Sequence, residues 1–212
     1  MIGAIAHPAL LVIAGALALT LARGPLRAAL ALGAPLLAIW AILAAPEGAL
    51  WTVRWLGMDL EPYSVDRLSR LFALIFAIMA FGGALFALNQ PSRLELPAAL
   101  VYAGSAIGAA LAGDLVTLFV FWELMAIGST LVIWSAATPA AYRASMRYLA
   151  VHLAGGVLLM AGIAGHVGDT GSTAFARFAL DTPAQWLILA GFLVNAGAPP
   201  LSAWLPDAYP EA

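Results

Sequence analysis

The sequence predicts an all-α integral membrane protein with about seven transmembrane helices, the seventh of them discontinuous. Hydrophobic residues make up 64% of the 212 residues and charged residues only 9%, whereas a water-soluble domain carries about 25% charged residues. The mean hydropathy is +0.98. Apolar stretches that approach the roughly 20 residues needed to cross a bilayer follow one another along the chain. The composition therefore argues against a water-soluble protein.

Six apolar stretches predict full transmembrane helices. They cover residues 2–22, 28–45, 68–88, 96–112, 115–134 and 141–167, and a seventh stretch opens at Ala184. The longest connection, 47–67, carries Trp51, Trp55 and Tyr63, and such aromatic residues favour the membrane interface. We expect this connection to lie along the surface as a short hairpin or amphipathic turn. Asp66 directly precedes the third span and fits a helix cap.

The arginines indicate how the chain is oriented in the membrane. Five of them lie in the first, third and fifth loops, namely Arg23, Arg27, Arg93, Arg143 and Arg147, and four lie on the opposite side. The positive-inside rule places the first set in the cytoplasm and the N-terminus outside. We expect a multi-pass protein of a bacterial inner membrane in this orientation.

Composition also argues against several classes of function. The net charge of −2 gives no basic footprint for nucleic acid. Cysteine is absent, so disulfides and thiolate ligands for metals or iron–sulfur clusters are excluded. The sequence has no His-Glu-x-x-His pair, no Gly-x-Ser-x-Gly elbow and no nucleotide-binding fingerprint. We therefore expect no metal and no cofactor, and little support remains for an intramembrane enzyme.

Two ionisable residues are predicted to lie near the membrane midplane. Glu123 follows Asp114 by a distance of about 13 Å along a helix, in a hydrocarbon core of about 30 Å. His152 lies roughly 16 Å into its own span by the same rise. Burying such a group costs at least about 2.5 kcal/mol, so each is a functional-site hypothesis by default. Glu123 is predicted to hold a proton and His152 to relay it, although a hydrogen-bonded structural carboxyl and a packing imidazole remain alternatives.

The seventh span carries a proline pair at comparable depth. Pro199 and Pro200 have no backbone N–H, so they cannot bond to the carbonyls of Asn195 and Ala196, and the helix must break there. Irregular backbone within a membrane is tolerated only against protein or a water-filled cavity. Asn195 and the freed carbonyls are therefore predicted to organise water near the midplane. A proline kink made only for packing is the alternative.

Other polar residues are assigned supporting roles. Thr130 lies on the helical face of Glu123 and could share a polar seam with it. Tyr148 lies one turn from His152 and is a possible partner for it. Arg143 and Arg147 lie near a helix end, where they either snorkel to the interface or act electrostatically beside Glu123 or His152.

Four motifs together resemble one family of membrane proteins. They are Val-Asp-Arg-Leu-Ser at 65–69, Asp-Leu-Val-Thr-Leu-Phe-Val-Phe-Trp-Glu-Leu at 114–124, Tyr-Arg-Ala-Ser-Met-Arg-Tyr-Leu at 142–149 and Pro-Leu-Ser-Ala-Trp-Leu-Pro-Asp-Ala at 200–208. The chain from about Asp66 onward resembles the antiporter-like membrane subunits shared by respiratory complex I, Mrp-type cation/proton antiporters and membrane-bound hydrogenases. Its ending looks most like the Mrp D-type subunit. Asp207, within the last motif, is counted among the supporting polar residues.

The resemblance implies a fold of fourteen helices, with about three at the N-terminus and then two inverted five-helix repeats that each contain a broken helix. It implies that Glu123 matches the family's buried glutamate. Asn195 falls where the family usually has a lysine that exchanges partners with that glutamate. This departure implies that His152 supplies a cation instead, or that the chain conducts weakly or only supports its neighbours.

The resemblance also divides the chain into two parts. Residues 1–95 are expected to form an N-terminal three-helix segment with the interfacial loop 47–67. Residues 96–212 are expected to form the first four helices of the first repeat, without a second inverted repeat, as in an N-terminal fragment or a split gene product.

The leading functional hypothesis is a subunit that translocates H⁺, with Na⁺ as a second ion, inside a larger membrane complex of the respiratory NADH:quinone oxidoreductase or Mrp antiporter type. Its expected partners are the lipid bilayer and other membrane subunits. The alternative hypothesis is a non-conducting subunit that holds conducting partners together.

Overall fold

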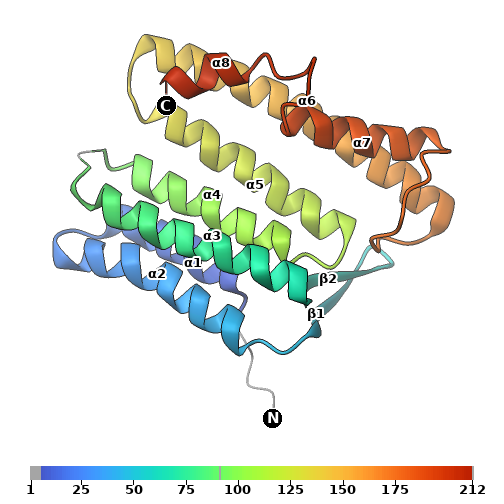
Figure 1. Ribbon diagram of the computed structural model, residues 1–212, viewed down its shortest axis with the longest axis horizontal. Helices are drawn as coiled ribbons and strands as arrows, with labels where there is room; N and C mark the ends of the chain where they lie inside the picture. The colour runs from blue at the N-terminus through green and yellow to red at the C-terminus, as the bar shows by residue number, and fades with distance from the viewer. Residues whose placement is uncertain (1–5, 91, 212) are drawn as a thin grey trace.

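The computed structural model describes residues 6–90 and 92–211 as a bundle of helices with one β-hairpin (Figure 1). The main helices are α1 (Pro8–Leu21), α2 (Pro25–Ala44), α3 (Arg67–Phe86), α4 (Glu95–Ala110), α5 (Leu115–Trp134), α6 (Pro139–Thr170), α7 (Pro183–Asn195) and α8 (Leu205–Ala208). The strands are β1 (Gly48–Trp55) and β2 (Met58–Val65), and two 3₁₀ turns cover Ala87–Asn89 and Tyr209–Glu211. The chain is mostly helical, as the sequence predicted.

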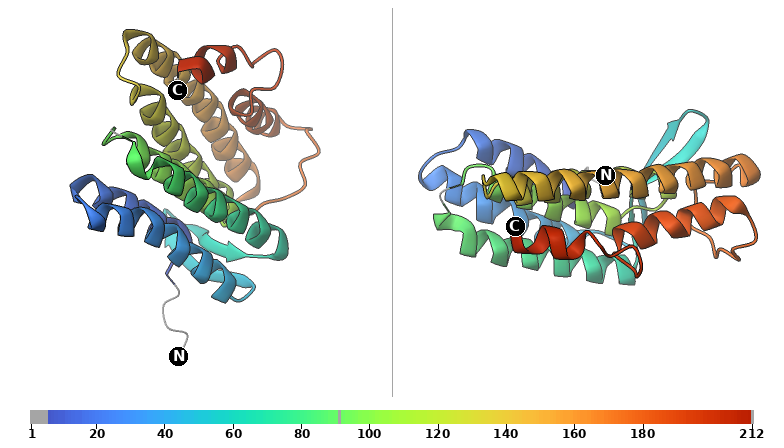
Figure 2. Two further views of the ribbon diagram at one scale, coloured as in Figure 1. Left: turned by 60° about the vertical axis from the view of Figure 1, so that its left-hand side comes forward. Right: turned by 90° about the horizontal axis from the view of Figure 1, so that it is seen from above.

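The helices pack in sequence order. Helices α1 to α4 form one group, α5 packs on α4, and α6 and α7 pack as a pair beyond α5 (Figures 1 and 2). Contacts between α1 and α4 close the first group. Helix α5 therefore lies between the two parts of the bundle.

Four helical stretches in the described part of the chain are long and apolar enough to cross a membrane. They are Pro25–Ala44, Arg67–Asn89, Leu115–Trp134 and Pro139–Thr170. Helices α1 and α7 are apolar but shorter. The predicted first span began at residue 2, whereas α1 begins at Pro8 and residues 1–5 lie outside the described residues. The predicted bounds 115–134 are those of α5, and α6 is longer than the predicted 141–167.

Burial follows the pattern of a protein surrounded by lipid. Small residues occupy the inner faces, such as Ala73, Ala77, Ala80 and Ala84 on α3, because small side chains let membrane helices approach closely. Many large apolar side chains point outward, and Phe86 is 91% exposed. An outer surface of this kind is unsuited to water.

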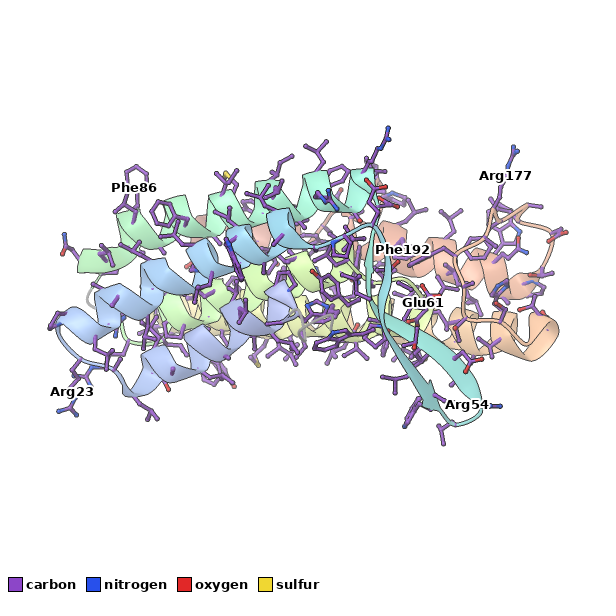
Figure 3. All side chains as sticks on the ribbon, turned by 90° about the horizontal axis from the view of Figure 1, so that it is seen from below. Arg23, Arg54, Glu61, Phe86, Arg177 and Phe192 are labelled. Atoms are coloured by element: carbon purple, nitrogen blue, oxygen red, sulfur yellow. The ribbon has the colours of Figure 1, made fainter. Side chains whose placement is uncertain are left out.

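The long connection after α2 is a β-hairpin, one of the two forms predicted for it. Strands β1 and β2 are antiparallel, and Trp55 pairs with Met58 across a tight turn. Leu56 and Gly57 in that turn have φ values of 50° and 82°, as a two-residue hairpin turn with the right twist requires. The hairpin projects from the bundle, with Arg54 near its tip (Figure 3).

Asp66 caps α3, as predicted. Its carboxylate accepts a hydrogen bond from the Ser69 backbone N–H at 2.7 Å, while the Ser69 hydroxyl accepts one from the Asp66 N–H at 2.8 Å. This reciprocal capping box satisfies two N–H groups at the helix start. The backbone hydrogen bond from Ser69 lowers the pKa of Asp66.

Candidate functional site

Helix α5 is anchored at its start by a buried carboxylate. Asp114 is 1% exposed, and its Oδ1 accepts hydrogen bonds from the N–H groups of Val116 and Thr117, both at 2.9 Å. Its Oδ2 accepts the Thr117 hydroxyl at 2.6 Å and the Glu61 N–H of β2 at 2.8 Å. Asp114 therefore ties the hairpin to the start of the helix that carries Glu123.

Glu123 lies near the middle of α5 and faces α6. A β-carbon placed on Gly156 would collide with the Glu123 carboxylate. Oxygen Oε1 of Glu123 is buried and has no hydrogen-bond partner among the described residues. The glycine at this position therefore makes room for a carboxylate pressed against the backbone of α6.

Asn195 of α7 lies against Gly155, the glycine that precedes Gly156 on α6. It is the last residue of α7, and a β-carbon on Gly155 would lie 2.7 Å from its Oδ1. Both polar atoms of the Asn195 side chain are buried without a hydrogen-bond partner in the described part of the chain. The Glu123 carboxyl and the Asn195 amide thus lie against consecutive residues of α6.

His152 lies one helical turn before this glycine pair. Its Nδ1 is 3.0 Å from the Tyr148 carbonyl oxygen, and because a carbonyl only accepts, Nδ1 carries the proton of this hydrogen bond. The imidazole stacks on the Tyr148 ring at a centroid distance of 3.8 Å and meets the Trp204 indole edge-on at 4.6 Å. In this tautomer the second ring nitrogen, Nε2, is an acceptor.

A cavity of about 510 Å³ connects several of these residues. Its polar lining comes from Tyr102, Ser129, Tyr148, His152, Asn195, Trp204 and Tyr209. The hydroxyls of Ser129 and Tyr148 are hydrogen-bonded at 2.7 Å. Glu123 is not part of the lining, although Trp122 and Ala126 beside it on α5 are. The cavity is large enough for ordered water, which needs several polar partners such as these.

The chain after α7 closes one side of the cavity. Beyond Asn195 it turns through Gly197, whose φ is 64°, and it resumes a helix at Leu205. The Trp204 indole N–H donates to the Val194 carbonyl at 3.1 Å, so the segment is fastened to the last turn of α7. Both Pro199 and Pro200 are exposed.

The supporting residues behave differently from one another. Tyr148 contacts His152, as expected. The Thr130 hydroxyl donates to the Ala126 carbonyl of its own helix at 2.7 Å, so its proton is not directed at Glu123. Arg147 pairs with Asp207 at 2.7 Å, with both side chains about half exposed, and Arg143 is exposed. Neither arginine contacts Glu123 or His152 through a described hydrogen bond or ion pair.

Two polar residues of this region were missed from the sequence. Ser129 was overlooked because a hydroxyl inside an apolar helix usually bonds to its own backbone. Asp114 served as the reference point for the depth of Glu123 and as the start of a motif, although an Asp followed by Thr117 at the start of an apolar run is also a recognisable capping signal.

Comparisons with known proteins find similar membrane subunits. Residues 112–212 match the family model described as NADH:quinone oxidoreductase/Mrp antiporter, transmembrane. The D-type subunit of a probable K(+)/H(+) antiporter from Rhizobium meliloti is 37% identical over 117 residues, which are 50% of this chain and 22% of that protein. The D-type subunit of the Na(+)/H(+) antiporter from Alkalihalophilus pseudofirmus is 27% identical over 177 residues, 74% of this chain and 36% of that protein.

A solved structure resembles nearly the whole chain. A chain of respiratory complex I from Thermus thermophilus with bound NADH superposes with a TM-score of 0.79 and 27% identity, over 99% of this chain and 47% of that chain. The protein described here therefore spans about half the length of that chain and a smaller share of the two antiporter subunits.

Proposed function

We infer that the chain belongs to the family of antiporter-like membrane subunits, and we propose that it translocates H⁺, with Na⁺ as a second ion, within a multisubunit membrane complex. The complex is of the respiratory NADH:quinone oxidoreductase or Mrp antiporter type. The matched parts make up 22% and 36% of the two antiporter subunits and 47% of the complex I chain.

One observation supports the proposal above the others. Glu123 and Asn195 come from different helices and meet consecutive glycines of α6, and each keeps a buried polar atom without a hydrogen-bond partner among the described residues. A buried polar group that forms no hydrogen bond costs about 1–3 kcal/mol. A structural role would be served better by apolar side chains, so this cost indicates that the groups are kept for exchange of a proton or for contact with water.

Each residue has a distinct role in the proposal. Glu123 holds the transferred proton on its carboxyl group. His152 accepts a proton at Nε2 while Nδ1 stays bonded to the Tyr148 carbonyl, and it passes that proton on. Asn195, as donor and acceptor at once, orders the water between them.

The proposal includes an arrangement in the membrane. Seven helices cross it, the seventh being α7 and α8 interrupted at the Asn195 turn, with the N-terminus outside in a bacterial inner membrane. Residues 1–95 form the N-terminal three-helix part, and residues 96–212 form the first four helices of a repeat. Other membrane subunits pack on the exposed apolar faces.

The test is Glu123→Gln in the complete complex, assayed as proton flux in sealed vesicles. The amide keeps the size of the side chain but cannot hold an exchangeable acid proton, so flux is expected to fall to the background of vesicles without the complex. A matched control is Glu47→Gln, a surface carboxylate whose contact with Arg67 is long, at 3.9 Å. Normal flux through the Glu123→Gln complex would contradict the proposal and leave a purely structural role for this chain.

A further inference from the structure

Two cavities lie on opposite halves of α5 and share two side chains. The cavity of about 510 Å³ extends along the second half of α5, past Ser129 and Ile133, toward Tyr209. A second cavity of about 560 Å³ lies along the first half, past Leu118, toward Ser64, Asp66 and Gly113 at the hairpin end. Trp122 and Met125 line both.

The two cavities also approach opposite ends of the bundle. The first is bordered by the segment after α7, and the second lies between α3, α4 and α5 beside the capping box of Asp66. Helix α5 runs from the hairpin end to the far end of the bundle (Figure 1). Together the cavities extend along most of its length, and only the pair Trp122 and Met125 is common to them.

The shared pair consists of an aromatic and a flexible apolar side chain. The Trp122 ring meets Phe192 of α7 edge-on at 5.1 Å, an arrangement that favours one orientation of the indole; Phe192 is labelled in Figure 3. Met125 has an unbranched, adaptable side chain, and it also borders a third cavity between α3 and α4. A rotation of Met125 therefore has free space to move into.

We propose that Trp122 and Met125 form a hydrophobic gate that separates a water space on the hairpin side from the water space around His152 and Asn195. A hydrophobic constriction blocks a water column by dewetting. Trp122 directly precedes Glu123 in the chain, and Met125 follows it two positions later. The Glu123 side chain therefore belongs to the part of α5 where the two cavities are separated. This inference rests on the proposed function, because an open column beside Glu123 would let protons bypass it.

Labelling of single cysteines tests the gate. The chain has no cysteine, so Ser129→Cys reports on the first cavity and Ala109→Cys on the second. A membrane-impermeant, positively charged methanethiosulfonate is added to either side of vesicles that hold the complete protein. With the gate intact, Ala109→Cys is expected to react from the hairpin side only and Ser129→Cys from the opposite side only.

Opening the gate should change one of these results. In the Ser129→Cys background, Trp122→Ala or Met125→Ala is expected to raise the labelling rate from the hairpin side by roughly tenfold or more, because the dewetted barrier is removed. Trp134→Ala is the matched control, since Trp134 is on the same helix but lines neither cavity. An unchanged rate in both gate variants, or labelling of Ser129→Cys from both sides with Trp122 and Met125 in place, would overturn the gate.

The gate and the proposed function can fail separately. Glu123→Gln in the same cysteine backgrounds is expected to stop proton flux and to leave the side-specific labelling as it was. If flux persists in this variant, the role of Glu123 is wrong while the labelling still decides the gate.

Discussion

The carboxylate of Glu123 on α5 fits against Gly156 on α6 at a position where a β-carbon would overlap its Oε1. The preceding glycine, Gly155, accommodates the side chain of Asn195 in the same way. Two missing side chains on α6 thus bring a carboxyl and an amide from two other helices to one level of the bundle.

Gly156→Ala is expected to reduce proton flux without unfolding the protein. The added methyl group meets the end of a flexible side chain, so the Glu123 carboxylate is displaced and the helices stay in place. A misplacement of about 1 Å can cost up to about 100-fold in rate, and we expect a loss of 10- to 100-fold. Gly168→Ala on the same helix is the control, because nothing lies within 4 Å of its added carbon; equal flux in the two variants would contradict the prediction.

Substitutions of Asn195 separate a water-ordering role from a packing role. Asn195→Leu has similar volume but no polar atom, and it relieves two buried polar atoms that have no hydrogen-bond partner among the described residues. We expect it to leave stability unchanged or raise it, while flux falls by about tenfold or more. Unchanged flux in the Asn195→Leu protein would assign Asn195 to packing alone.

Asn195→Lys is expected to raise flux above that of the native chain, because it places a cation beside Glu123.

Asp114→Ala is expected to destabilise the protein far more than Asp66→Ala. Removal of the buried Asp114 carboxylate leaves the N–H groups of Glu61, Val116 and Thr117 without their acceptor, which costs about 3 kcal/mol or more. Loss of the exposed Asp66 cap costs about 1 kcal/mol. Thermal unfolding of both variants in detergent measures the difference, and similar melting temperatures would show that Asp114 does not hold the hairpin in place.

The cap that His7 forms on the first turn of α1 should weaken in acid. The His7 Nδ1 accepts the Ala9 N–H at 3.2 Å and its Nε2 donates to the Pro62 carbonyl at 2.9 Å, so a proton added at Nδ1 removes the cap of α1. Burial lowers the pKa of His7 from 6.5. The unfolded chain therefore takes up the proton first, and the contribution to stability is lost as the pH falls below 6.5.

Hydrogen exchange at the Ala9 amide tests this contact. In the native protein, the protection of the Ala9 amide is expected to decrease as the pH is lowered below 6.5. His7→Gln keeps a hydrogen-bonding side chain that does not titrate, so protection should then be independent of pH over this range. A native protein whose Ala9 protection, corrected for the intrinsic exchange rate, does not change with pH would contradict the prediction.

Local chemistry settled a large part of this protein from the sequence. Long apolar runs identified a membrane protein because a helix must cover the hydrocarbon thickness with apolar residues. The bounds of α5 and the cap at Asp66 followed from residues adjacent in the chain. Glu123 and His152 could be placed near the middle of their helices because rise per residue is constant.

Only the tertiary structure decided what these residues face. Arg147 and Asp207 are 60 positions apart and form an ion pair, whereas Thr130 turned to its own backbone and not to Glu123. The meeting of Glu123 with Gly156 and of Asn195 with Gly155 depends on how α5 and α7 rotate and cross against α6. Those angles result from packing over whole helix surfaces, so no short stretch of sequence contains them.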